Sequence, residues 1–145
     1  MSDFTGPGTY TLAHVTLPRN DLMSMRAIQM IDPVDTGRER YDQQFLFAHL
    51  GGDEFFFISR KHGTYLTAAR NQQLTAEVLP PVDRRIRWKL VPVRDGSGAF
   101  FIASLAFPGH VIDVAWGFSD NENPIIIYPR KEEDSENQQF YLRAV

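Results

Sequence analysis

The sequence contains no cysteine. A disulfide scaffold and thiol catalysis are therefore excluded, and one sign of a secreted protein is missing. The first residues, 1–8, show no basic region followed by an apolar one, so we predict no signal peptide. No apolar run approaches the roughly 20 residues that a membrane helix needs. We expect a cytoplasmic protein, or one released without a leader, that does not insert into membranes.

Positive charge is also scarce, with 15 Lys and Arg against 18 Asp and Glu and a formal net charge of -3. A nucleic-acid backbone requires clustered Lys and Arg. The two basic clusters, in residues 38–40 and 84–87, are interrupted by acidic or apolar residues. They indicate a solvated loop or strand face. We therefore predict no nucleic-acid partner.

The residue patterns of catalytic and metal sites are missing as well. No two of the four histidines have the spacing of a metal-binding helix; they are His14, His49, His62 and His110. There is no Gly-x-Ser-x-Gly elbow, and Gly96-Ser97-Gly98 lacks the Lys of a phosphate loop. The acidic run Glu132-Glu133-Asp134 indicates a solvated loop. We predict no enzyme activity, no catalytic residue, no metal and no cofactor.

Helical periodicity is nearly absent. Only residues 21–30 could form an amphipathic helix, and they alternate equally well as a strand. Elsewhere short apolar and aromatic runs are separated by Gly, Pro, Asn and Asp, which is typical of strands and turns. The 145 residues, 43% of them hydrophobic, predict a single all-β domain over 1–145 with a packed core.

The order of these runs recurs three times along the chain. Phe45, Trp88 and Phe140 occupy corresponding places at comparable intervals. The repeats span approximately residues 1–50, 51–95 and 96–145, and each contains four short strands. No unit closes a core alone, so the three must associate to bury their apolar faces. Three such units with pseudo-threefold symmetry predict a β-trefoil, a barrel capped by hairpins.

A short motif opens the fourth strand of each repeat, and in the third repeat we expect that strand to start at Asn137. It reads Gln43-Gln44-Phe45 in the first, Gln138-Gln139-Phe140 in the third, and Ile86-Arg87-Trp88, without the Gln, in the second. With these motifs the sequence resembles the ricin-B-like β-trefoil lectin family over essentially its whole length. The opening Gly6-Pro7-Gly8-Thr9-Tyr10 is similar to the start of small, leaderless fungal members. The motif itself reports the fold, because its Gln and aromatic residues mostly belong to the core.

The resemblance also implies a sugar site in the third repeat. Galactose-binding members supply an Asp on the second strand, an aromatic residue ending the third, and an Asn before the motif Gln, which braces the Asp. Asp113, Tyr128, Asn137 and Gln138 match these places. Tyr128 would stack on the apolar face of galactose, while Asp113 and Asn137 would bind its 3- and 4-hydroxyls. The expected ligands are glycans ending in galactose or N-acetylgalactosamine.

The first repeat matches this pattern less well. Ser24 falls near the place of the Asp, and Asp42-Gln43 stands where Asn-Gln would. No aromatic residue ends its third strand, in 31–34. Ser24, Asp42 and Gln43 form a weaker candidate site.

The second repeat departs from the pattern at every place. Thr67 replaces the Asp, Leu79 the aromatic residue, and Arg85-Ile86 the Asn-Gln pair. We predict that it binds no sugar.

Three residues near Asp113 could serve either the carbohydrate site or the packing of the protein. His110 precedes it by three positions, and Trp116 and Phe118 follow it in a loop. His110 and Trp116 are further candidates for the carbohydrate site. The alternatives are packing in the strand for His110, and burial or a dimer contact for the two aromatic residues.

Two other classes of function remain open. A β-trefoil protease inhibitor could present an exposed loop, such as residues 79–83 or the loop around Pro108, to an enzyme cleft. A structural module without a ligand would leave Tyr128 and Asn137 unexplained. The resemblance favours a defence agglutinin, which would act as a homodimer because one shallow site binds sugar weakly.

Overall fold

The computed structural model describes residues 4–14, 44–70, 73–115 and 125–145, and this part is built from β-strands. No helix in it is long and apolar enough to cross a membrane. The strands are β1 (Gly8–His14), β2 (Gln44–Gly51), β3 (Glu54–Ser59), β4 (Tyr65–Thr67), β5 (Thr75–Glu77), β6 (Trp88–Pro92), β7 (Phe100–Ser104), β8 (His110–Val114), β9 (Ile125–Pro129) and β10 (Phe140–Ala144). Two short 3₁₀ helices, η3 (Arg84–Ile86) and η5 (Glu136–Gln138), precede β6 and β10.

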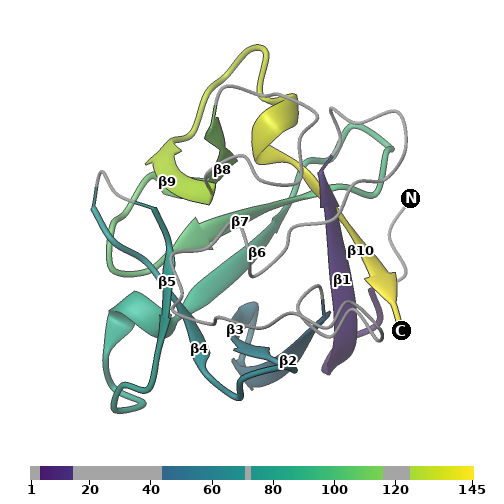
Figure 1. The fold of residues 1–145 in the computed structure, drawn as a ribbon. Helices are drawn as coiled ribbons and strands as arrows, with labels where there is room; N and C mark the ends of the chain where they lie inside the picture. The colour runs from purple at the N-terminus through teal and green to yellow at the C-terminus, as the bar shows by residue number, and fades with distance from the viewer. Residues whose placement is uncertain (1–3, 15–43, 71–72, 116–124) are drawn as a thin grey trace.

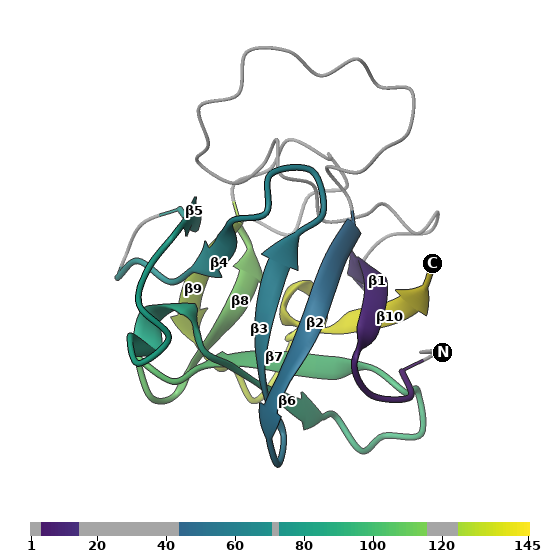
Figure 2. The ribbon, with the colours of Figure 1, turned by 90° about the horizontal axis from the view of Figure 1, so that it is seen from below.

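The strands close into a barrel. Neighbouring strands pair antiparallel around the ring in the order β1, β2, β3, β6, β7, β10, and β10 pairs back with β1. In Figure 1 β1 and β10 lie side by side, and Figure 2 shows β2 and β3 next to them in the barrel wall. A closed ring leaves no exposed edge among its strands.

Two hairpins extend from this ring in the same way. The β4–β5 hairpin pairs with β3 through Ile58 and Tyr65, and the β8–β9 hairpin pairs with β7 through Ala103 and Val111. The second and third repeats therefore share one plan. The hairpin predicted for the first repeat falls in residues 15–43, outside the described residues. The count of twelve strands, the single domain and the repeat boundaries stay predictions.

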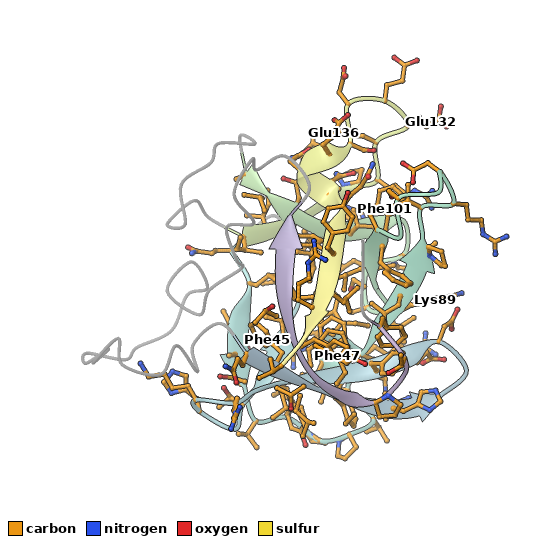
Figure 3. The ribbon with its side chains drawn as sticks, turned by 90° about the vertical axis from the view of Figure 1, so that its right-hand side faces the viewer. Phe45, Phe47, Lys89, Phe101, Glu132 and Glu136 are labelled. Atoms are coloured by element: carbon orange, nitrogen blue, oxygen red, sulfur yellow. The ribbon has the colours of Figure 1, made fainter. Side chains whose placement is uncertain are left out.

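The aromatic landmarks of the repeats lie in the core. Phe45, Trp88 and Phe140 are fully buried at the beginnings of β2, β6 and β10. The indole N–H of Trp88 donates a hydrogen bond to the carbonyl of Leu66, 2.9 Å away, and so joins the β4–β5 hairpin to the barrel. Figure 3 shows Phe45 on β2 near Phe47, another fully buried ring.

The segments before β6 and β10 correct one expectation. A strand was expected from Ile86, and another opening at Asn137, but both residues lie in 3₁₀ helices. In η3 the Asp83 carboxylate accepts a hydrogen bond from the backbone N–H of Arg85. In η5 the N–H of Gln138 donates to the carbonyl of Ser135. These local bonds occupy groups that a strand would pair with its neighbour.

Residues 51–53 form a sharp turn. It joins β2 to β3, and both of its glycines have positive φ, +122° at Gly51 and +58° at Gly52. A side chain at Gly51 would meet no other atom within 4 Å, so only backbone conformation restricts that position.

Candidate functional site

The β8–β9 hairpin places Asp113 and Tyr128 on one face. Asp113 pairs with Ile126 and Val111 pairs with Tyr128, so the four side chains share the face opposite the core. On that face Asp113 and Tyr128 are diagonal cross-strand neighbours. Tyr128 is 50% exposed at the end of β9, whereas Asp113 is 4% exposed.

Helix η5 brings two amides against Asp113. Asn137 Nδ2 donates to Asp113 Oδ1 at 3.0 Å, and Gln138 Nε2 donates to Oδ2 at 2.9 Å. The same amides reach the hairpin backbone, Asn137 at the carbonyl of Val114 and Gln138 at the carbonyl of Pro129. Gln138 thus makes the contact with Asp113 that the resemblance implied. The cluster also holds η5 against both strands of the hairpin.

Lys131 is a member of the site that sequence reasoning missed. Its ammonium donates to Asn137 Oδ1 at 2.7 Å, and its backbone N–H donates to Gln138 Oε1 at 3.0 Å. The sequence signal that could have indicated it was its position, between the end of β9 and the acidic run that begins at Glu132.

Burial raises the pKa of the Asp113 carboxyl above its ordinary value of 3.8. The hydrogen bonds from Gln138 and Asn137 and the positive charge of Lys131 act in the opposite direction. Desolvation therefore outweighs the three groups that favour the charged carboxylate.

The cluster still has hydrogen-bonding capacity. A carboxylate has about four acceptor positions, and the amides of Asn137 and Gln138 use two of those on Asp113. The amide oxygen of Asn137 has a second lone pair beside the bond from Lys131, and the ammonium has two further N–H groups. With the exposed ring of Tyr128, the site combines acceptors and donors for hydroxyls with an apolar platform.

The other predicted site residues lie apart from this cluster or outside the described residues. His110 precedes Asp113 by three residues on β8, so the two side chains lie on opposite faces of the strand. Its Nδ1 donates to the carbonyl of Pro108. The remaining candidates fall in ranges that the structure does not describe: Trp116, with Phe118 beside it, and the first-repeat residues Ser24, Asp42 and Gln43.

The second repeat has different chemistry at the corresponding place. By strand register Thr67 stands where Asp113 does, as predicted, but Glu77 stands where Tyr128 does. The expectation of Leu79 there was wrong, because β5 is in register with β4 only as far as Glu77.

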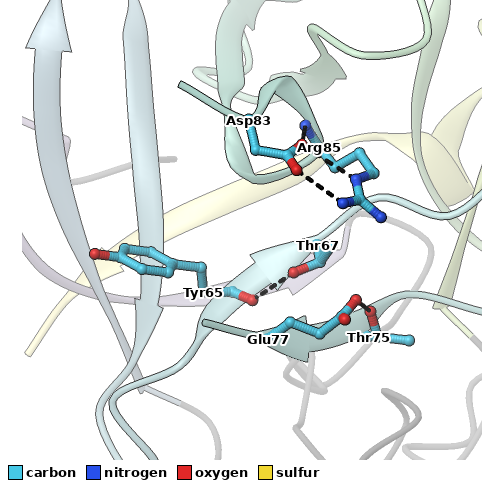
Figure 4. Close-up of polar contacts among 6 residues, drawn as sticks. All are labelled: Tyr65, Thr67, Thr75, Glu77, Asp83 and Arg85. Carbon is cyan, nitrogen blue, oxygen red and sulfur yellow. Dashed lines mark hydrogen bonds and ion pairs between the residues drawn. The ribbon is translucent and has the colours of Figure 1, made fainter. Parts of the chain in front are cut away.

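The polar side chains around this place make three separate local interactions (Figure 4). Thr67 Oγ1 donates to the carbonyl of Tyr65, Thr75 Oγ1 donates to Glu77 at 2.8 Å, and Arg85 pairs with Asp83 at 2.7 Å. The Asp-Asn-Gln cluster of the third repeat has no counterpart here. In the part of the chain that the structure describes, no group of three or more His, Asp or Glu side chains could hold a metal ion.

The comparisons with known proteins concern the fold. No family model matches the chain, and no curated protein sequence matches it. Among solved structures, a structure described as the BEL beta-trefoil superposes with a TM-score of 0.71 at 15% identity, over 100% of this chain and 97% of the other. The chain is a β-trefoil.

Two further β-trefoil matches agree with the repeat analysis. The designed threefold-symmetric protein ThreeFoil has a TM-score of 0.75 at 18% identity, covering 95% of this chain and 99% of the other. The Macrolepiota procera ricin B-like lectin, solved with lactose, has a TM-score of 0.74 at 18% identity over 99% and 100%. The predicted β-trefoil fold is confirmed, and the resemblance to ricin-B-like lectins is matched by this structural neighbour. At these identities the likeness is one of fold.

Proposed function

We propose that this β-trefoil is a non-enzymatic lectin that binds glycans ending in galactose or N-acetylgalactosamine through its third repeat. The observation that supports it most is the Asp113–Asn137–Gln138 cluster on the same face as the half-exposed Tyr128. The β-trefoil fold does not require this cluster, because the second repeat folds in the same way without it.

The chemistry of the site suits a hexose with vicinal hydroxyls. Asp113 and Asn137 offer acceptors for hydroxyl protons, and Lys131 offers donors to hydroxyl oxygens. Galactose has one ring face on which C–H groups gather, and Tyr128 offers the apolar platform for that face. The match to a lectin solved with lactose supports the same ligand class.

A glycan array with matched tyrosine variants tests the proposal. Tyr128→Ala removes the exposed platform, whereas Tyr65→Ala removes a partly exposed tyrosine from the hairpin of the second repeat. We expect wild type and Tyr65→Ala to bind terminal galactose or N-acetylgalactosamine, and Tyr128→Ala to lose about tenfold or more in affinity. Absence of binding by wild type to every such glycan would refute the lectin proposal.

The biological role follows from valency. One shallow site gives an affinity on the order of -4 to -6 kcal/mol, so retention on a cell surface needs two or more linked sites. We therefore propose that the protein is a homodimer and acts as a defence agglutinin. Red-cell agglutination that free galactose inhibits, together with a dimer mass in sedimentation equilibrium, would support this; a monomer that does not agglutinate would contradict it.

One loop favours protease inhibition as a second candidate function. Val78 and Val82, at 75% and 81%, are the most exposed large hydrophobic side chains of the described residues. The segment between them is braced, since the N–H of Asp83 donates to the carbonyl of Pro80 and Arg87 Nε donates to the carbonyl of Pro81, both at 2.9 Å. A braced, protruding apolar segment can enter an enzyme cleft at a small entropic cost.

A panel of endopeptidases separates the two functions. An inhibitor would show nanomolar to micromolar inhibition that Val82→Asp abolishes and Tyr128→Ala leaves unchanged. The lectin proposal predicts the reverse: no inhibition, and sugar binding that Val82→Asp does not alter. Because Val82 is 81% exposed, its replacement should not disturb folding.

A further inference from the structure

A hollow of about 550 Å³ adjoins the proposed sugar site. Its lining comes from three parts of the chain: Val93 after β6, Phe101 on β7, and the segments that flank η5. In Figure 3 Phe101 lies below Glu132, in the loop after β9, and below Glu136, at the start of η5. The volume is within the usual range for small-molecule sites.

Lys131 makes the hollow and the sugar site continuous. Its side chain lines the hollow, while its ammonium contacts Asn137 in the Asp113 cluster. Ser135 also borders the hollow, and its carbonyl accepts the N–H of Gln138. A glycan whose terminal residue contacts Asp113 therefore has the hollow beside it.

The hollow has unused hydrogen-bonding groups over an apolar floor. The guanidinium of Arg130 lies 4.1 Å from the centre of the Phe101 ring. An attraction between a guanidinium and a ring face does not require the five N–H donors of the guanidinium to form hydrogen bonds. Gln139 donates its amide N–H to Ser135 Oγ at 3.0 Å, which leaves its amide oxygen as an acceptor.

The charges around the hollow favour a neutral occupant. Arg130, Lys131 and Glu132 all line the hollow, and Glu133 and Asp134 follow in the same loop. Charges of both signs therefore lie close together, so a ligand of either sign meets repulsion as well as attraction. Mixed donors and acceptors beside an apolar surface suit the hydroxyl groups and C–H groups of a sugar ring.

We propose that this hollow is a second subsite, which binds the neutral sugar residue next to the terminal one through Arg130 and Gln139. The inference rests on the proposed function, because the terminal sugar must first be held at Asp113. It makes the protein selective for galactose-ended oligosaccharides over the free monosaccharide.

Calorimetric titration with methyl β-galactoside and with lactose tests the subsite. We expect wild type to bind lactose about tenfold more tightly, the gain that one or two additional hydrogen bonds give. Arg130→Met removes the edge N–H groups but keeps an apolar side chain over Phe101. Val93→Trp fills the hollow instead, and Val82→Trp adds the same bulk to an exposed loop elsewhere.

Both hollow variants should bring the lactose-to-galactoside ratio close to one, with methyl β-galactoside affinity within about twofold of wild type because the terminal contacts remain. Val82→Trp should keep the wild-type ratio. If wild type binds both sugars and the hollow variants keep its ratio, the subsite is refuted while the lectin proposal stands. If wild type binds neither sugar, the lectin proposal is refuted and the subsite with it.

Discussion

At the scale of single residues, Asp113 combines two opposing tendencies. Its carboxyl is almost completely buried, which favours the protonated form, yet two amides and an ammonium lie around it in positions that favour the carboxylate. Such a group is of more use for binding than for stability, because a well-packed apolar residue would cost less to bury.

Removing the carboxylate should destabilise the protein. Asp113→Ala leaves the buried amide N–H groups of Asn137 and Gln138 without their acceptor, at a cost of about 1–3 kcal/mol. Urea unfolding measures this change. As a control, Asp53→Ala replaces an aspartate in an exposed turn and should change the free energy of unfolding by at most about 0.5 kcal/mol. Equal losses in both variants would contradict this account of the cluster.

The stability contribution of Asp113 should also depend on pH. Its pKa is raised in the folded state, so the folded protein takes up this proton before the unfolded chain does as pH falls. The contribution of Asp113 to the free energy of unfolding should therefore increase as pH falls through its raised folded-state pKa. It should stop increasing below the unfolded-state pKa of 3.8, where the unfolded chain takes up the same proton.

Urea unfolding of wild type and Asp113→Asn over a series of pH values isolates this effect, because the amide cannot titrate. The stability of wild type relative to the variant should increase toward acid pH. A relative stability that decreases toward acid pH would show that the folded-state pKa is lowered instead.

At the scale of the elements, the β2–β3 turn depends on backbone conformation. Gly51 has φ +122°, a region that other residues rarely occupy, and an added Cβ would meet no atom within 4 Å beyond its chain neighbours. Gly51→Ala should therefore destabilise the protein by about 1–3 kcal/mol through strain alone. Gly52 has φ +58°, which Asn tolerates, so Gly52→Asn should cost much less. Thermal unfolding compares the two, and similar losses would argue against conformational strain.

The elements also indicate what the sequence could predict. The strands were predictable because apolar alternation and the turn at Gly51-Gly52 are local signals. The 3₁₀ helices η3 and η5 were not, because each depends on two i to i+3 bonds without any periodic pattern, with a cap from Asp83 in η3. Strand register caused the error at Leu79, since the chain leaves the β5 pairing two residues earlier.

The candidate site was predictable in part for a similar reason. Asp113, Asn137 and Gln138 are brought together by the repeat, and a repeat can be recognised in sequence. Lys131 joins them through one long side chain, whose direction depends on the path of the loop after β9. No pattern of residue types specifies that path.

At the scale of the whole molecule, β1 and β10 complete the barrel. Leu12 and Leu142 pair across them, and both are fully buried. Leu142→Ala should cost about 2–5 kcal/mol, because it opens a cavity where the two strands meet. Leu46→Ala, on the 43% exposed leucine of β2, should cost much less. Guanidinium unfolding by circular dichroism measures both, and comparable losses would contradict a core that includes this seam.

The pairing of β1 with β10 also affects when the protein can fold. Tyr10 pairs with Ala144, so this contact must wait until nearly all of the described chain has left the ribosome. Contacts between distant parts of a sequence slow folding, because loop closure must precede the gain from pairing. Until β10 arrives, β1 and β7 each lack a partner and present strand edges to other chains. Nascent chains of this protein should therefore be prone to pairing with other chains until β10 has left the ribosome.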